Sequence, residues 1–254
     1  MPFTLSHPAA VLPLRRFGRW RGDFTALVIG SLSPDFPYYV PGLQLPSMHT
    51  LAASLWFCLP AGWLVLAGFE AVKQPLCSLL PQPHRAALMP LALRRRDWNW
   101  RALLIGSGSL LLGAWSHQLW DLFTHASRGG ADYLPWLLDD IPLGGDTLPL
   151  YKMLQWLSGA AGAAVLAAAY RRWLRRQPAV AAAPGRRPWL LLTALGLAAS
   201  GAALPFALNA ALDFGGCRFC RAFLFEEWVH AADLFLGLLL LSALAAQCQR
   251  SGAT

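Results

Sequence analysis

Apolar residues are concentrated in five long stretches of the chain, which are separated by shorter polar segments. Each stretch has about 20 residues, the length that an α-helix needs to cross the hydrocarbon core of a bilayer. Pro60 and Pro205 fall inside two of the stretches, where membrane helices tolerate proline as a kink. The pattern therefore predicts five transmembrane helices, at Leu51–Val72, Ala102–Trp120, Leu148–Tyr170, Trp189–Leu212 and Val229–Ala246.

A shorter apolar segment precedes these stretches. Residues 24–32 are too few to span a bilayer, and Ser33 and Pro34 end the segment. We expect a short interfacial or buried helix here. The fold predicted by the whole pattern is an all-α, polytopic membrane helical bundle. It forms a single membrane domain over residues 1–254, with an N-terminal segment, a transmembrane bundle and a tail at 1–50, 51–246 and 247–254.

Composition supports a membrane protein and argues against two other classes. Hydrophobic residues make up 56% of the 254 residues and charged residues only 13%, whereas an ordinary soluble domain is about 25% charged. A soluble protein so poor in charge could not cover its surface, and disordered chains are charge-rich and apolar-poor. The net charge of +8 comes from short basic runs between apolar stretches. Such runs indicate membrane topology, so we expect no nucleic-acid binding.

The charges of the loops predict the orientation in the membrane. Loop 73–101 holds six Lys or Arg against one Asp, and loop 171–188 holds six Arg and no acid. Loops 121–147 and 213–228 are acidic overall. Because basic loops stay in the cytoplasm, we expect a multi-pass plasma-membrane protein with a cytoplasmic C-terminus and with residues 1–50 outside. The four Arg against two Asp in residues 1–50 disfavour that last assignment.

The strongest chemical motif is His117-x-x-x-Asp121-x-x-x-His125, at the end of the second predicted span. Steps of four residues place the three side chains along one face of a helix. Imidazole and carboxylate groups on one face suit a divalent metal ion. An ionisable residue such as His117 inside an apolar span is also a functional candidate by default. The alternative is that Asp121 caps the helix end and His125 belongs to the loop.

Other ligand-type residues are expected at the same membrane face. His49 lies just before the first span, and the start of span one meets the end of span two if the two helices are antiparallel neighbours. His7 and Asp35 belong to the same 50-residue segment as His49. Each has a simpler explanation: His7 or His49 as a helix cap, and Asp35 as a turn residue. Their joint convergence with His117 and Asp121 favours a shared site.

The fifth predicted span starts at this face and adds further polar residues. Glu226 and His230 are four residues apart, and His230 and Asp233 are three apart, so both pairs share a helix face. A solvated surface pair or a structural hydrogen bond would explain them equally well. His84 falls on the opposite side, in a basic loop. Cys217-x-x-Cys220 is a single pair, too few for a structural zinc site.

Several segments together resemble a known family. They are Met1–Ala10, Ile29–Asp35, His117-x-x-x-Asp121 and Thr124-His125. The sequence is similar to the bacterial membrane family called domain of unknown function 4184. That family distantly resembles predicted membrane-bound metal-dependent hydrolases and, still more distantly, zinc-dependent phospholipases C and single-strand nucleases. The resemblance implies metal ligands at His7, Asp35, His49, His117 and Asp121, in a bacterial inner membrane.

The sequence departs from the zinc phospholipases in one respect that bears on the metal count. It has no second forward His-x-x-x-acid pair, because Glu226-x-x-x-His230 is reversed. The resemblance therefore implies one or two ions rather than three.

The resulting hypothesis is a metal-dependent hydrolase. A divalent ion, Zn²⁺ first with Mn²⁺ or Mg²⁺ as alternatives, would activate water. His125, Glu226 or His230 would act as general base or as a hydrogen-bond partner of the ligands. A site at headgroup depth suggests membrane lipids as neighbours and a lipid or phosphodiester substrate. The alternative is a non-enzymatic protein in which the cluster is a structural polar or metal network. A transporter site would lie nearer the midplane.

Overall fold

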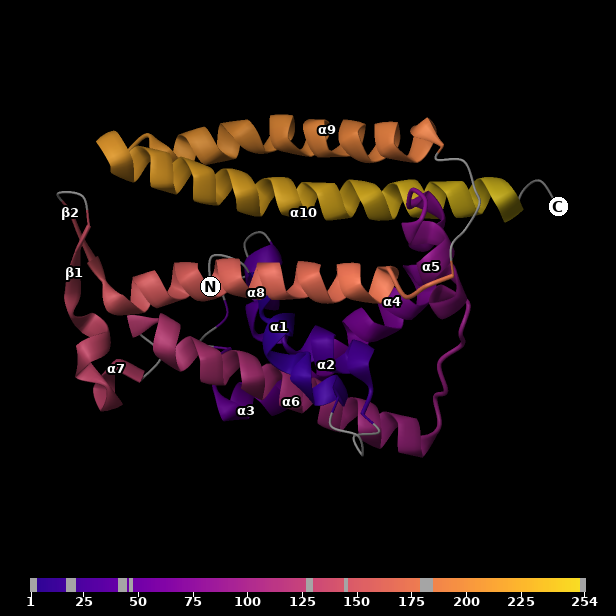
Figure 1. Cartoon of the computed structure of the whole chain (residues 1–254), viewed down its shortest axis with the longest axis horizontal. Helices are drawn as coiled ribbons and strands as arrows, with labels where there is room; N and C mark the ends of the chain where they lie inside the picture. Colours follow the sequence, from indigo (N-terminus) through magenta and orange to yellow (C-terminus); the bar gives the residue numbers. More distant parts are fainter. Residues whose placement is uncertain are drawn as a thin grey trace. The chain divides into compact units, whose positions relative to one another are not determined.

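The structure, a computed structural model, describes residues 4–16, 22–40, 45, 48–126, 130–143, 146–178 and 185–251. These residues are mostly helical, with one two-stranded hairpin (Figure 1). The chain divides into two compact units, which are described separately below. The first comprises residues 1–68 and 97–175, and the second comprises 69–96 and 176–254. The single membrane domain stays a prediction.

The N-terminal part of the first unit is a series of short helices. Two one-turn segments, Thr4–Ser6 and Pro13–Arg16, flank α1, and α2 is followed by a 3-10 helix at Ser33–Tyr39. The bounds of the two α-helices are Pro8–Val11 and Phe24–Gly30. The Asp23 carboxylate caps α2 by accepting from the Ala26 amide at 3.0 Å. Since α2 buries Ala26, Leu27, Ile29 and Gly30, the prediction of a short buried helix is confirmed.

Three long helical segments form the body of the first unit. The first runs without a break through α3, a π-helical turn and α4, and the others are α6 and α8. Their bounds are Leu51–Ala53, Ser54–Cys58, Leu59–Leu79, Trp100–Thr124 and Leu150–Leu174. Ala26, Ile29, Leu66 and Leu110 form an apolar core between α2, α4 and α6.

The crossing of α2 and α6 depends on two glycines. A Cβ on Gly113 would lie 2.3 Å from the Leu27 carbonyl oxygen, and one on Gly30 would lie 2.1 Å from that of Leu110. Such distances are shorter than real Cβ contacts, so only glycine allows the two backbones to approach this closely. The Asp23 amide also donates to Ser109 Oγ at 3.0 Å, which fixes the start of α2 on α6.

The acidic loop between the second and third predicted spans contains local structure that the all-α prediction missed. Helix α7 (Gly130–Tyr133) and a 3-10 turn (Pro135–Leu138) lead into strands β1 (Asp140–Leu143) and β2 (Asp146–Pro149). The strands are antiparallel, with Asp140 opposite Pro149 and Leu143 opposite Asp146. The stretch is too short for a sheet period to be recognised, and its glycines point equally well to a loop.

The second unit contains the end of α4, the short helix α5 (His84–Ala92), and the pair α9 (Arg186–Ala211) and α10 (Gly216–Ser251). Helices α9 and α10 lie side by side and antiparallel (Figure 1). Small residues four positions apart allow close packing along α9. They are Ala199, Ala203, Ala207 and Ala211, all buried.

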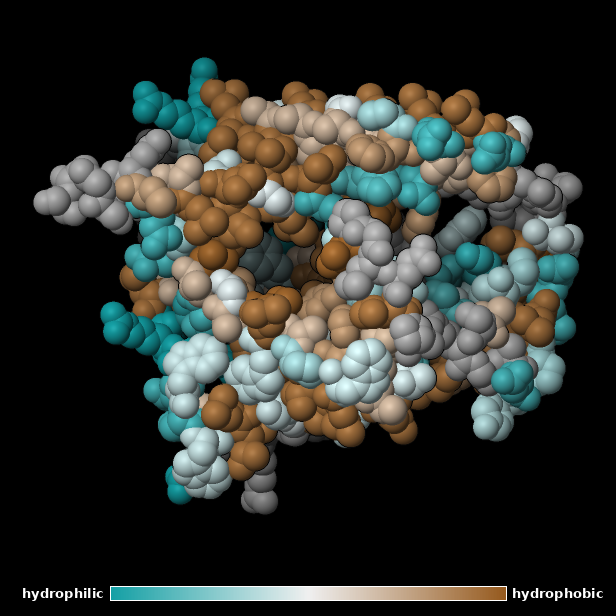
Figure 2. Space-filling view, turned by 180° about the vertical axis from the view of Figure 1, so that it is seen from behind, coloured by the Kyte–Doolittle hydropathy of each residue, from teal (hydrophilic) through white to brown (hydrophobic). Residues whose placement is uncertain are grey.

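Four helices are long and apolar enough to cross a membrane, at Leu51–Ser78, Leu150–Leu174, Arg186–Ala211 and Ala222–Cys248. They match four of the five predicted spans. The second predicted span does form a helix, α6, but α6 is not among the four, because buried polar side chains such as Ser109, His117 and Gln118 lower its hydropathy. Apolar residues cover much of the face drawn in Figure 2, as expected for a surface in contact with lipid.

Candidate metal centre

Three segments of the first unit bring the ligand-type residues together. His117 and Asp121 lie one turn apart in the last two turns of α6. His49 lies two residues before α3, and Asp35 lies in the 3-10 helix that follows α2. The start of the first apolar helix and the end of α6 therefore meet, as the sequence predicts for antiparallel neighbours.

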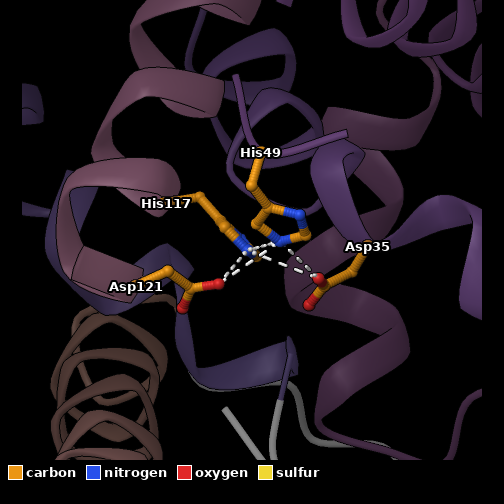
Figure 3. A group of neighbouring side chains, drawn as sticks. All are labelled: Asp35, His49, His117 and Asp121. Atoms are coloured by element: carbon orange, nitrogen blue, oxygen red, sulfur yellow. Dashed lines mark hydrogen bonds and ion pairs between the residues drawn. The ribbon is translucent and has the colours of Figure 1, made fainter. Parts of the chain in front are cut away.

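Asp35, His49, His117 and Asp121 point toward a common centre (Figure 3). His49 Nε2 lies 3.1 Å from Asp35 Oδ1 and 3.3 Å from Asp121 Oδ2. His117 Nε2 lies 3.4 Å from each of the same two oxygens. The two imidazole Nε2 atoms are 3.3 Å apart. Each of the four side chains is at most 6% exposed.

Further contacts orient these side chains. His117 Nδ1 donates to the Ser31 carbonyl at 2.8 Å, which leaves Nε2 directed at the centre. Thr4 Oγ1 donates to Asp35 Oδ2 at 2.7 Å, while Oδ1 faces the two imidazoles. Gln118 Nε2 donates to the Thr50 carbonyl at 3.1 Å and to Ser54 Oγ at 3.0 Å, next to His49. Such partners are what hold metal ligands in position.

The four inward-facing atoms fit a metal ion. A tetrahedral Zn²⁺ with bonds of about 2.0–2.1 Å has ligand atoms about 3.3 Å apart. The five separations given above run from 3.1 to 3.4 Å. Two carboxylates would neutralise the charge of a divalent ion in this buried place. The group can therefore hold a metal, and the role of each residue as a ligand stays a prediction.

His7 lies beside this group of four rather than among it. Its ring stacks on that of His117, with centroids 3.6 Å apart and planes inclined by 18°. His7 Nε2 is 3.8 Å from Asp121 Oδ1, the oxygen that faces away from His49 and His117. Both His7 ring nitrogens are buried, and neither has a hydrogen-bond partner among the described residues.

The pKa values of His7 and Asp35 are both lowered, but for different physical reasons. Burial, together with the neighbouring His117, lowers the pKa of His7 from 6.5 to about 3. Burial alone would raise the pKa of the Asp35 carboxyl, but hydrogen bonds from His117, His49 and Thr4 outweigh it and hold that pKa well below its usual value. At neutral pH, His7 is therefore a neutral imidazole and Asp35 a carboxylate, which are the forms that bind metal.

His125 marks the edge of the cluster. It follows α6 directly, its side chain is 26% exposed, and its Nδ1 lies 3.4 Å from Asp121 Oδ1. The Gln155 amide on α8 contacts His125 Nε2 at 3.0 Å. The helical stripe of His117, Asp121 and His125 thus points at one site, although His125 itself has extended backbone.

The simpler explanations of single residues do not account for the contacts. His7 precedes α1 but makes no capping hydrogen bond, and Thr50, not His49, caps α3.

The sequence did not reveal four of the residues that orient the centre, which are Thr4, Ser31, Gln118 and Gln155. Only Gln118, a second polar residue beside His117 inside an apolar stretch, gave a signal that could have pointed to it.

Glu226 and His230 belong to the second unit. They lie in α10, with His230 Nε2 3.4 Å from Glu226 Oε2 and the His230 ring 5.2 Å from that of Phe206. Both lie inside the candidate span Ala222–Cys248 rather than at the start of a span, because α10 begins at Gly216. Their part in catalysis stays a prediction. The Cys217 side chain lies outside the described residues.

Comparison with known families identifies the chain. The family described as Domain of unknown function (DUF4184) matches residues 1–243. The chain belongs to this family. The matched range includes all the residues of the centre described above, the whole first unit, and the second unit as far as residue 243. No curated protein and no solved structure matches the chain.

Proposed function

We propose that this membrane-type DUF4184 protein binds a divalent metal ion through Asp35, His49, His117 and Asp121 and uses it in hydrolysis. The observation that carries the proposal is the spacing of the four inward-facing atoms, because five of the six separations match the edges of a metal-centred tetrahedron. The orienting bonds from Ser31, Thr4 and Gln118 support it.

Zn²⁺ is the ion that we propose first. Two imidazole nitrogens and two carboxylate oxygens in a tetrahedral arrangement are typical zinc ligands. Mg²⁺ prefers octahedral oxygen sites that retain several waters, and this donor set is half nitrogen. Mn²⁺ accepts both donor types but prefers more ligands, so it is the second choice.

Hydrolysis of a lipid or phosphodiester-type substrate is the reaction that the surroundings favour. A bound divalent ion supplies Lewis-acid chemistry and lowers the pKa of a water. His49 lies two residues before the candidate span Leu51–Ser78, and Gln155 lies near the start of the span Leu150–Leu174. The centre thus lies at the ends of apolar helices, where lipid headgroups would be. His125, which is partly exposed beside Asp121, is the best-placed general base.

A structural metal site is the second candidate, and one observation favours it. The four residues already supply a full tetrahedral set, whereas catalytic zinc sites keep one position for water. In that case the ion would tie the N-terminal segment to α6 and no turnover would follow.

Metal content tests the binding proposal. Protein purified in detergent, chelated and reloaded with Zn²⁺ should hold metal, and His49→Ala, His117→Ala and Asp121→Ala should each lose most of it. His84→Ala, a histidine of the second unit, should keep the wild-type content. Wild-type content in all three cluster variants would overturn the site.

Turnover distinguishes the two candidates. Metal-loaded and chelated protein would be assayed for phosphodiesterase activity and for headgroup release from mixed phospholipid vesicles. Metal-dependent turnover that His125→Gln reduces would support hydrolysis. Absence of turnover from protein shown to hold its metal would favour the structural site.

A further inference from the structure

Asp121 presents its two carboxylate oxygens to different partners. Oδ2 faces His49 and His117, at 3.3 and 3.4 Å, and belongs to the group of four. Oδ1 faces the other way, toward His7 Nε2 at 3.8 Å and His125 Nδ1 at 3.4 Å. A carboxylate whose oxygens each face imidazole nitrogens has the geometry of a ligand shared by two cations.

The stacking of His7 on His117 prevents these two rings from binding one ion. A metal ion bound to an imidazole lies in the plane of the ring, along the lone pair of the nitrogen. The two rings are 3.6 Å apart and inclined by only 18°, so their planes do not meet within bonding distance of the nitrogens. His7 therefore cannot join the group of four as a fifth ligand in this arrangement.

His7 nevertheless has the properties of a ligand. It is 1% exposed, and both ring nitrogens are buried without a hydrogen-bond partner among the described residues. A buried polar group without a partner is costly, and one such group in a structure calls for an explanation. A cation between His7 and Asp121 would provide the missing partner.

We propose a second divalent-cation position, between His7 Nε2, Asp121 Oδ1 and His125 Nδ1, with Asp121 bridging the two ions. This inference rests on the proposed function, because it adds a position next to the group of four. Two ions that each lie in one of the stacked planes, near the shared carboxylate, would be separated by about the distance between the rings. Separations of about 3.5–4 Å are typical of two-metal hydrolytic sites.

Three protein ligands leave the second position incomplete, so water or a substrate oxygen would complete it. The Gln155 amide nitrogen contacts His125 Nε2, and a 180° rotation of the amide group would place its oxygen there to accept the Nε2 proton. His125 Nδ1 would then bind the second ion as a ligand, so His125 would act as the general base only where the second position is empty. The second position would be the open one, next to a tetrahedral group that is already full.

Metal stoichiometry tests this inference. Chelated wild-type protein would be titrated with Zn²⁺ and analysed for metal after removal of free ion. We expect two ions per chain in the wild type and one in His7→Phe, which keeps a ring stacked on His117 but has no ligand atom. His125→Gln should also hold one tight ion, and His84→Phe, the matched control, should hold two.

A spectroscopic readout adds to the count. Mn²⁺-loaded wild-type protein should give the paramagnetic resonance spectrum of a coupled pair, and His7→Phe the spectrum of an isolated ion. One ion at saturation in the wild type, or two in His7→Phe, would overturn the second position and leave the group of four standing. No bound ion in the wild type would overturn the proposed function as well. A failure of His7→Phe to fold would leave the decision to His125→Gln.

Discussion

Gln118 is predicted to control metal affinity without touching the metal. Its buried side-chain amide lies on α6 and donates to the Thr50 carbonyl and to Ser54 Oγ, at 3.1 and 3.0 Å. These two bonds hold the turn that carries His49 against α6. Replacement by Leu fills a similar volume but removes both bonds, although the Thr50 carbonyl still accepts from the Ser54 amide at 3.0 Å. Because two hydrogen bonds are lost, each worth about 0.5–1.5 kcal/mol, Gln118→Leu should lower the free energy of unfolding by about 1–3 kcal/mol.

The effect on metal binding should be larger than a general loss of stability explains. Loss of an orienting partner typically weakens metal binding about 10–100-fold. We expect the first equivalent of Zn²⁺ to bind Gln118→Leu weaker by a factor in that range, in competition with a chromophoric chelator. Gln155→Leu is the matched control, because Gln155 is also buried but contacts His125 and none of the group of four. Affinities of Gln118→Leu and Gln155→Leu that agree within about twofold would refute the reasoning, provided that both variants keep wild-type helix content.

Two further predictions concern packing and topology. Gly113→Ala should destabilise the first unit by about 1–3 kcal/mol or more, since the new Cβ would lie 2.3 Å from the Leu27 carbonyl oxygen. Gly108→Ala is the control, because a Cβ there would have nothing within 4 Å, and it should be neutral or slightly stabilising. Thermal unfolding measures both effects. A single cysteine placed in loop 171–188 of an otherwise cysteine-free variant should resist a membrane-impermeant maleimide in intact cells, and efficient labelling from outside would reverse the predicted orientation.

Hydropathy was enough to predict the long helices, because their exposed faces must be apolar whatever they pack against. Leu64, Leu197 and Leu241 are all more than 60% exposed. The same criterion was weaker for α6, which the sequence analysis counted as a fifth span. Its inner face carries Ser109, His117, Gln118 and Asp121, so the polarity of the centre is added to an otherwise apolar helix.

The centre was partly predictable for a different reason. Histidines and acids at the ends of antiparallel apolar helices must come to the same level, and this topology alone brought His49 to His117. The topology did not separate His7 from the group of four. A histidine whose ring stacks on a ligand and a histidine that is itself a ligand can have the same spacing in the sequence. Two of the orienting groups, from Ser31 and Thr4, were beyond prediction as well. The Ser31 carbonyl is a backbone atom, and Thr4 is 31 residues from its partner Asp35.

The proposed metal binding would be thermodynamically linked to the packing of α2 on α6, and this gives a last prediction. Asp35 follows α2, and the carbonyl of Ser31, at the end of α2, accepts from His117 on α6. The close crossing at Gly30 and Gly113 is therefore a condition for assembling the centre, and an ion that binds only the assembled centre stabilises that crossing.

The linkage should change amide hydrogen exchange in one region of the chain and not in another. Chelation should speed amide hydrogen exchange in residues 22–40, which are held on α6 partly through the centre, and not along α9 in the second unit. At a free ion concentration of 100 times the dissociation constant, the ion adds about 2.7 kcal/mol, or about 100-fold slower exchange where opening breaks the centre. Exchange in residues 22–40 that is the same with and without metal, in protein that binds it, would mean that the ion does not couple to this packing. His117→Ala should abolish the difference, because its exchange would already match that of chelated wild-type protein.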